Sequence, residues 1–321
     1  MHQQSRSTQE QATKESRRRK LETEEEERRR LHEALKPIRN ARKGYFYEIP
    51  AGEFLMGEEK VLTKISKSFE MMDVHVTQFI WAQLKIAMGE TNVRLINPSV
   101  FSDYLNRSGD KSSRNDIIVK IDDFEFHMQI NNPVESINTD TKVQDFLNGL
   151  NELSKYGDSQ IQDLLRDLFP GHQKGDHYDL PTEAQWEYVM TNLGKANKPY
   201  FDSDDDAELN KYAYYDESNG VRLSGPWDKT LAVASLQPRI INGKPFFDLE
   251  GNVADLVKDL WDGVSSVPGG VDPLGAKGDF RIARGGGWAF GSKDLRYFSR
   301  WKVNPRSSHH SVGIRLIRTR P

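Results

Sequence analysis

The side-chain types that most often perform catalysis are sparse in this sequence. Cysteine is absent, which excludes disulfides, thiolate metal sites and cysteine nucleophiles. The tightest potential metal cluster is His172, Asp176 and His177 in GHQKGDHYD, a glycine-rich loop that we interpret as a structural lead-in to the next helix. Glu183 and Glu187 lie four residues apart on one predicted helix face, and we expect structural pairing rather than acid–base catalysis.

Glycine and acidic motifs add no catalytic signal. No phosphate-binding loop of the Gly-x-x-x-x-Gly-Lys-Ser/Thr type and no Gly-x-Ser-x-Gly nucleophile turn occurs. Three consecutive glycines, 285–287, precede Trp288 rather than a phosphate-binding helix, and they predict a tight crossing where backbones approach closely. The acidic run Asp202, Asp204, Asp205 and Asp206 is interpreted as a solvated loop rather than a metal site.

Length and charge limit the classes of function. The chain has 321 residues and a formal net charge of −3, which gives no electrostatic case for nucleic-acid binding. The N-terminus lacks the apolar region of a secretory signal, and no apolar run is long enough to span a membrane. We therefore expect a cytoplasmic protein without membrane contact.

The polar N-terminal arm, residues 1–43, is expected to precede one folded domain, residues 44–321. Residues 1–16 are predicted to be disordered, and residues 17–36 to form a charged helix with Glu–Arg pairs four residues apart. The arm carries 13 Lys and Arg against 8 Asp and Glu. It is either a solvated, self-paired helix or a docking arm for an assembly partner.

Within the domain, the residue patterns predict short strands and a few amphipathic helices. YFYEIPAGEFLMG predicts two strands around a Pro-Ala-Gly turn, and Thr77 is a candidate N-cap for the helix that follows. Further helices are predicted near 139–155 and 159–168. Thr182 and Gln185 form a capping box. Residues 97–131 are expected to be irregular, and the chain beyond residue 200 is expected to be rich in loops and short strands.

Six segments, in order, resemble the formylglycine-generating-enzyme (sulfatase-modifying-factor) family. They are IPAGEFLMG, VHVTQFIWAQLKIAMG, NPVESIN, YDLPTEAQWEYVM, FDLEGNVADL, and RIARGGGWAFGSKDLRYFSRW with VGIRL. The resemblance spans most of residues 45–320. It implies an α+β domain with a C-type-lectin-like fold and little regular secondary structure.

The resemblance does not carry over the oxidase chemistry of the family. The cysteine pair that binds copper in the family's oxidases corresponds by position to Phe290 and Leu295. Neither side chain can form a thiolate or bind a metal, so we expect no copper and no such oxidation.

A structural calcium ion is a second feature that the resemblance implies. By position, its ligands would be the carboxylates of Asp248 and Asp255 and the carbonyl groups of Gly251 and Val253. Calcium prefers such a mixture of hard oxygen ligands on a tight turn. A metal-free, hydrogen-bonded loop is the alternative interpretation.

The function that remains is binding through the C-terminal segment, around residues 288–312. This segment is rich in aromatic and cationic side chains, and similar segments hold the variable positions in the target proteins of diversity-generating retroelements. The expected ligand-binding residues are Phe290, Ser292, Lys293, Arg296, Tyr297, Arg300, Lys302, Ser308, His309 and His310. The partner would be a protein or another macromolecule.

Two alternatives to a binding module stay open. One is a tailoring enzyme of unknown chemistry that uses Arg284, Arg296, Arg300 and His309. The other is a fixed scaffold subunit that is docked by residues 1–43. Trp288 and Trp301 are expected to be core residues.

Overall fold

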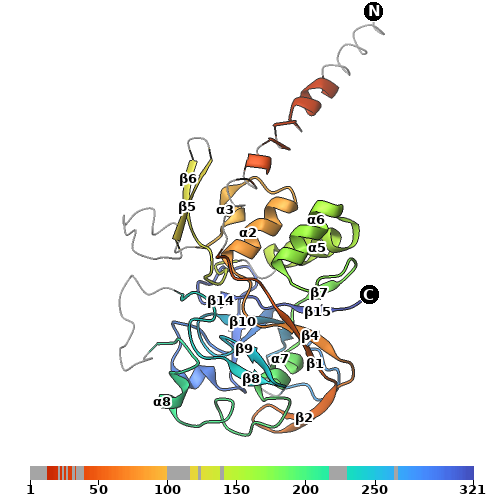
Figure 1. The fold of residues 1–321 in the computed structure, drawn as a ribbon. Coiled ribbons are helices and arrows are strands. Elements are labelled where there is room, and N and C mark those ends of the chain that lie inside the picture. Colours follow the sequence, from red (N-terminus) through yellow and green to blue (C-terminus); the bar gives the residue numbers. More distant parts are fainter. Residues whose placement is uncertain are drawn as a thin grey trace, which may run out of the picture.

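The computed structural model describes residues 13–20, 22–23, 25–26, 28–30, 33, 40–99, 116–121, 124–137, 141–216, 230–263 and 267–321. The helices are α2 (Gln78–Ala87), α3 (Val93–Ile96), α5 (Lys142–Tyr156), α6 (Ser159–Leu168), α7 (Glu183–Met190), α8 (Asp206–Leu209) and the 3₁₀ turn η2 (Ser292–Leu295). Short strands and loops make up much of the remainder, as an α+β domain of this type requires (Figure 1).

Within the described ranges, the strands form two four-stranded sheets, one three-stranded sheet and two hairpins. The sheet in the order β1-β4-β15-β7 contains Phe46–Ile49, Phe69–Met72, Ile317–Thr319 and His177–Asp179. The sheet in the order β13-β12-β10-β14 contains Arg300–Val303, Phe280–Arg284, Ala254–Trp261 and Val312–Gly313. The sheet in the order β11-β3-β2 contains Gly270–Val271, Val61–Ile65 and Gly52–Met56. The hairpins pair β5 (Asp116–Ile121) with β6 (Phe124–Gln129) and β8 (Arg239–Ile241) with β9 (Lys244–Phe246).

Helix caps lie where the sequence predicts them. The Thr77 side chain accepts a hydrogen bond from the Ile80 backbone amide at the start of α2. Thr182 and Gln185 form both hydrogen bonds of the predicted capping box at the start of α7. Because each cap satisfies a backbone group that the first helical turn leaves without a partner, local sequence sets where these helices begin.

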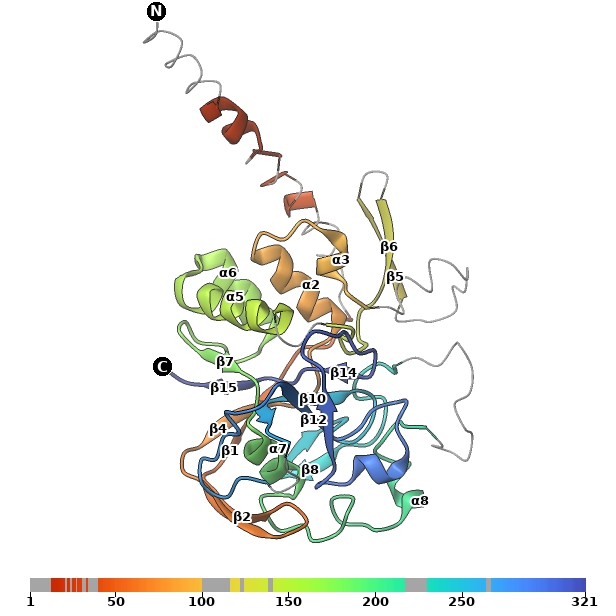
Figure 2. The same ribbon diagram turned by 180° about the vertical axis from the view of Figure 1, so that it is seen from behind.

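Two large apolar clusters hold the domain together. One lies beneath α2, α5 and α6 and includes Trp81 stacked on Phe146 with ring centroids 4.3 Å apart. The other lies around α7, includes Trp186, and draws on strands of all three larger sheets. Figures 1 and 2 show that α2, α5 and α6 gather in one half of the domain, whereas α7 lies in the other half beside β10.

One predicted irregular stretch is more regular than expected. Part of residues 97–131 forms the β5–β6 hairpin, with Asp116 opposite Gln129 and Ile121 opposite Phe124. The prediction of an irregular segment was therefore wrong for residues 116–121 and 124–129. The β-branched run in DIIVKI is a strand signal that the surrounding polar residues concealed. Residues 100–115 lie outside the described part of the chain.

The described residues of the N-terminal arm between 13 and 33 are helical and exposed. Ion pairs four residues apart join Glu15 to Arg19 and Glu26 to Arg30, and the latter pair follows the predicted Glu–Arg pattern. Figure 1 shows this helix extending away from the domain. Across the described residues, no helix is both long enough and apolar enough to cross a membrane.

Candidate ligand-binding surface

The C-terminal segment begins with a backbone crossing that only glycine permits. Gly285 has φ +84°, and a Cβ atom there would lie 2.4 Å from the Leu249 carbonyl oxygen. The predicted tight crossing is therefore confirmed, and its cause is contact with the neighbouring loop. The next side chain, Trp288, is buried and donates a hydrogen bond from Nε1 to the His310 carbonyl oxygen at 3.1 Å. This bond joins the two ends of the segment.

Apolar packing occupies the two positions that correspond to the family's cysteines. Leu295 is fully buried in a small cluster with Tyr200, Leu209, Ala213 and Tyr215. Phe290 is half-buried and packs against the edge of that cluster. Both positions therefore serve side-chain packing.

A row of three half-buried rings crosses the surface of this segment. Phe290 meets Trp301 edge to face, with ring centroids 4.6 Å apart, and Trp301 meets His309 in the same way at 5.2 Å. Trp301, which the sequence placed in the core, is thus only half-buried and joins the two predicted contact residues. We call Phe290, Trp301 and His309 the ring row. Edge-to-face contacts hold such rings in fixed positions, so the row presents a rigid apolar surface.

Ser308 and His310 are exposed beside this row. The His310 ring lies edge-on to Trp288, with centroids 5.1 Å apart. Burial lowers the pKa of both His309 and His310 below the usual value. Both rings are therefore neutral at pH 7, which suits apolar contact or single hydrogen bonds rather than attraction of an anion.

Tyr297 and Arg300, which the sequence placed on the binding surface, lie in the interior. Tyr297 is buried, and its hydroxyl accepts a hydrogen bond from Lys60 Nζ. Arg300 donates from Nε and Nη2 to the two carboxylate oxygens of Glu183 at 2.6 and 2.9 Å. Its guanidinium also stacks on Trp261 at 4.5 Å. A large polar side chain can be buried when the fold provides a buried partner for it. That partner lies elsewhere in the chain, so the segment alone does not predict the burial.

The remaining predicted contact residues do not converge on the ring row. Ser292 Oγ donates to Asp206 Oδ2 at 3.0 Å, at the start of η2. Lys293 is exposed, whereas Arg296 is half-buried near the Phe298 ring. Lys302 follows Trp301 in β13, so its side chain leaves the opposite face of the sheet.

A buried ion-pair network supports the segment from below. Arg284 is fully buried and contacts both Glu183, at 3.2 Å, and Glu187. Burial raises the pKa of Glu187, and Arg284 opposes that shift. The expected pairing of both glutamates is present, and it holds Arg284 and Arg300 in the interior.

An arginine occupies the loop to which the resemblance assigned calcium. Arg315 Nε donates to Asp255 Oδ2 at 3.0 Å, and Trp186 Nε1 donates to the same oxygen at 2.9 Å. His75 Nε2 lies 3.0 Å from the other oxygen, Oδ1. Burial alone would raise the pKa of Asp255, but Arg315 and His75 hold that pKa at about 2. The Asp255 carboxylate is therefore ionised and faces an existing cation.

Asp248, the other proposed carboxylate ligand, also has a structural partner. Asp248 is buried, and its Oδ2 accepts a hydrogen bond from the Ala234 amide at 2.9 Å. Gly251 has φ +78° and packs directly on the Tyr214 backbone, while Val253 is buried. In the described ranges, no three His, Asp or Glu side chains converge to hold a metal. As arranged here, these residues do not fit a calcium ion, which needs roughly six to eight oxygen ligands.

His172 and the acidic run have structural partners. His172 Nδ1 lies 2.8 Å from the Tyr178 hydroxyl, and its Nε2 lies 3.0 Å from Gln162 Oε1. His177 is exposed. In the acidic run, Asp205 caps α8 and Asp204 pairs with Lys198. These contacts agree with the structural interpretation of both segments.

The fold, with apolar side chains at the positions of the oxidases' cysteines, defines a non-cysteine domain of the formylglycine-generating-enzyme type. A family model described as "Sulfatase-modifying factor enzyme 1-like domain" matches residues 34–320, and the chain belongs to this family. No curated protein sequence matches the chain.

Solved structures share this fold. Treponema denticola variable protein 1 is 22% identical and superposes with a TM-score of 0.59, and the match covers 86% of this chain and 95% of that one. PvdO from Pseudomonas aeruginosa is 19% identical with a TM-score of 0.51, and the match covers 86% and 94% of the two chains.

Proposed function

We propose that the chain is a non-catalytic binding module that contacts a protein or another macromolecule through its C-terminal segment, around residues 288–312. The ring row carries the proposal, because Phe290, Trp301 and His309 form a rigid apolar strip that is still partly exposed. Aromatic side chains are enriched where binding energy concentrates in protein interfaces. Their low conformational freedom reduces the entropy lost on binding.

The architecture around the segment also favours binding. Strand β13 anchors its middle, and strand β14 anchors its end in the same sheet. The Trp288 indole joins the first residues of the segment to its last loop. The exposed loop between β13 and β14 can therefore change in sequence while its ends stay fixed.

We propose further that this segment is diversified by a retroelement. The segment has the layout of retroelement-diversified proteins, and a solved structure of the same fold is named a variable protein. From the exposure of each side chain, we can predict which codons of the segment should vary. Codons for Phe290, Lys302, Ser308, His309 and His310 should vary, whereas those for the interior residues Tyr297 and Arg300 should stay constant.

Sequencing of the gene's neighbourhood tests diversification. The expected result is a near-copy of the codons for residues 285–316 beside a reverse transcriptase, with differences mainly at adenines and at exposed positions. Absence of such a copy refutes diversification. Differences concentrated at buried positions would refute the assignment of the contact surface.

Photo-crosslinking tests binding itself. A benzoylphenylalanine residue would replace Phe290 in one variant and the exposed Tyr156, on α5, in a matched control. After irradiation in cells that contain the native partners, we expect a discrete adduct from position 290 that position 156 does not give. The same products from both positions would contradict binding through the C-terminal segment.

We also propose that the N-terminal arm contacts an assembly partner. Its described residues between 13 and 33 are helical and exposed, so they offer a charged surface to a partner. Deletion of residues 1–39 is the appropriate test, because Arg42 and Lys43 already pair with Asp73 and Asp167 of the domain. A smaller assembly with an unchanged melting temperature is expected, and an unchanged assembly would refute the proposal.

A further inference from the structure

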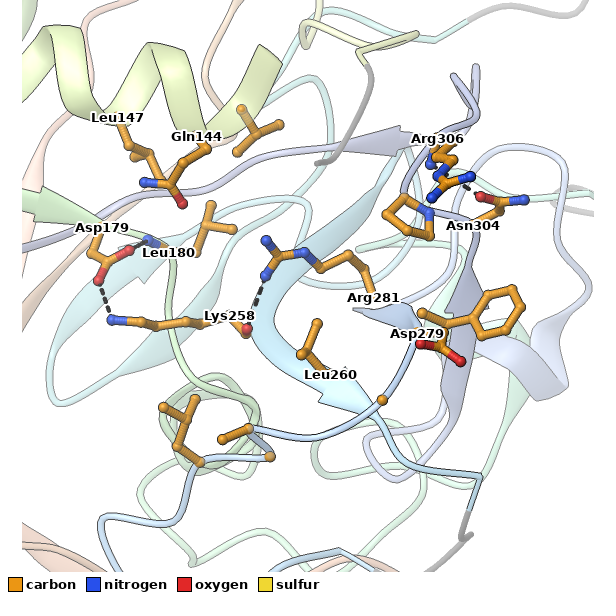
Figure 3. Close-up of a pocket in the computed structure, with 17 residues that line it drawn as sticks. Gln144, Leu147, Asp179, Leu180, Lys258, Leu260, Asp279, Arg281, Asn304 and Arg306 are labelled. Atoms are coloured by element: carbon orange, nitrogen blue, oxygen red, sulfur yellow. Dashed lines mark hydrogen bonds and ion pairs between the residues drawn. The ribbon is translucent and has the colours of Figure 1, made fainter. Parts of the chain in front are cut away.

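A groove of about 650 Å³ lies between α5, the end of β7, and strands β10 and β12 (Figure 3). Residues 304–306, which follow β13, close one end of the groove. Its size falls within the range of roughly 300–1,000 Å³ that is usual for sites of small ligands or short peptide segments. None of its lining residues belongs to the ring row.

Apolar side chains form much of the groove's wall. Leu147 enters from α5, Leu180 follows β7, Leu260 lies on β10 and Phe280 on β12. Leu147 and Leu180 are almost fully buried, so they form a fixed base, whereas Leu260 and Phe280 remain partly exposed. A ligand with an apolar body would bury these partly exposed surfaces on entry.

Arg281 provides one of the positive charges of the groove, together with Lys258 and Arg306. Its Nη1 donates to the Lys258 carbonyl oxygen at 3.1 Å. Among the described residues, no carboxylate lies within ion-pairing distance of its guanidinium. By contrast, Lys258 Nζ is paired with Asp179 Oδ2 at 2.5 Å. Figure 3 shows the Arg281 guanidinium reaching across the groove toward Lys258 and away from Asp279.

Because Lys258 is ion-paired and Arg281, within the described part of the chain, is not, the Arg281 guanidinium determines the chemistry of the ligand. The bond to the Lys258 carbonyl holds one end of the guanidinium and leaves other N–H groups unused. A guanidinium matches the planar geometry of a carboxylate better than it matches a single acceptor. The charged side chains of the lining are Lys258, Arg281 and Arg306 against Asp179 and Asp279, a net charge of +1, so a singly charged group on an apolar body fits better than a phosphate.

We propose that this groove binds a carboxylate carried on an apolar body, with Arg281 as its charge partner. A free alkyl or aryl acid and the C-terminal residue of a peptide share this chemistry. The proposal does not depend on the function assigned to the ring row. It makes the chain a two-site binder, in which the groove and Trp301 of the ring row lie on the same face of β12 and β13 but share no lining residue.

Isothermal titration calorimetry of the full chain tests the proposal. The probes are N-acetyl-Leu-Phe with a free carboxylate, the same dipeptide as its amide, 3-phenylpropionate and inorganic phosphate. We expect the free-acid dipeptide to bind and the amide to bind at least about tenfold more weakly, because only the acid can form a charge-assisted bidentate contact. Comparable binding of 3-phenylpropionate would identify free acids as the source, and selective binding of the dipeptide would identify peptide termini.

Substitutions at Arg281 supply the second readout. Arg281→Gln should weaken binding of the free-acid dipeptide by about tenfold to a hundredfold, and Arg281→Lys by less, because lysine keeps the charge but loses the paired donors. Arg166→Gln is the matched control, because Arg166 is an exposed arginine on α6 that does not line the groove. Melting temperatures of all three variants exclude unfolding as the cause.

Several results would overturn the proposal. They are equal binding of the acid and the amide, unchanged binding by a folded Arg281→Gln variant, phosphate binding as tight as that of the dipeptide, or no binding of either carboxylate probe. Because Arg281→Gln leaves the ring row intact, the crosslink from position 290 should persist in this variant. Failure of one site is therefore distinguishable from failure of the other.

Discussion

Two cations on β13, Arg300 and Lys302, offer a matched test of what is structural in the C-terminal segment. Both were predicted to contact ligand, and they lie two residues apart on the same strand. Arg300 has only 8% of its side chain exposed and is held by Glu183. Lys302 is exposed and lies over the Phe280 ring at 3.7 Å. Substitution of each residue by methionine removes one positive charge and keeps a long apolar side chain.

The two substitutions should lower the free energy of unfolding by amounts that differ several-fold. Arg300→Met removes two hydrogen bonds to a buried carboxylate, and Glu183 keeps only Arg284, at 3.2 Å, as a cationic partner among the described residues. Hydrogen bonds to charged groups contribute about 1.5–3 kcal/mol each, and their losses overlap, so the free energy of unfolding should fall by about 3 kcal/mol. For a domain of this size, that loss lowers the melting temperature by roughly 6 °C. Lys302→Met should cost below about 1 kcal/mol.

Urea denaturation and thermal melting of the two variants provide the measurement. Equal stability of Arg300→Met and Lys302→Met would refute the buried role that we assign to Arg300. The crosslinking assay supplies an independent check. A stable Arg300→Met variant that loses the crosslink from position 290 would place Arg300 back on the binding surface.

Three further predictions concern the interior. Arg315→Met should lower the free energy of unfolding by about 3–5 kcal/mol, because it leaves the Asp255 carboxylate buried beside fewer donors. EDTA should leave the melting temperature of the wild-type protein unchanged. A large decrease in that melting temperature would support a bound calcium ion. Burial raises the pKa of Asp259 to about 6. This pKa exceeds the unfolded value, so deprotonation of Asp259 destabilises the fold as pH rises from about 4 to 6, by roughly 3 kcal/mol at most, and Asp259→Asn should flatten that part of the stability–pH profile. Gly285→Ala should cost about 1–3 kcal/mol in urea denaturation, through strain at positive φ and collision with Leu249; a neutral effect would contradict the close crossing.

The starts of two helices could be predicted from the sequence, because contacts between neighbouring residues determine them. Thr77 and Thr182 begin helices because each side chain caps a backbone amide three residues later, and this relation is visible in the sequence itself. The three glycines at 285–287 also predicted a close crossing, although its partner, the Leu249 loop, is not visible in the local sequence. The α+β fold also followed from the order of the family-like segments.

The candidate site was less predictable because long-range partners determine the burial of its polar side chains. Arg300 is withdrawn from the surface by Glu183, which lies 117 positions away in the sequence. Arg315 meets Asp255 across 60 positions, a contact that the position-by-position assignment of calcium ligands did not include. Arg281 carried no sequence signal, since its importance arises from the carboxylates that the fold keeps away from it.

The pairing of β4 with β15 also has a consequence for folding. Arg318 on β15 binds Glu70 on β4, so this sheet is completed only when segments 248 positions apart in the sequence meet. Such a closure is entropically costly and slows folding. During synthesis, the edge of β4 that pairs with β15 stays unpaired until residues 317–319 have left the ribosome. Residues 288–312 are made just before this closing strand, while the edge of β4 is still unpaired. A new apolar side chain in this segment can therefore disturb folding of the nascent chain as well as change the native surface.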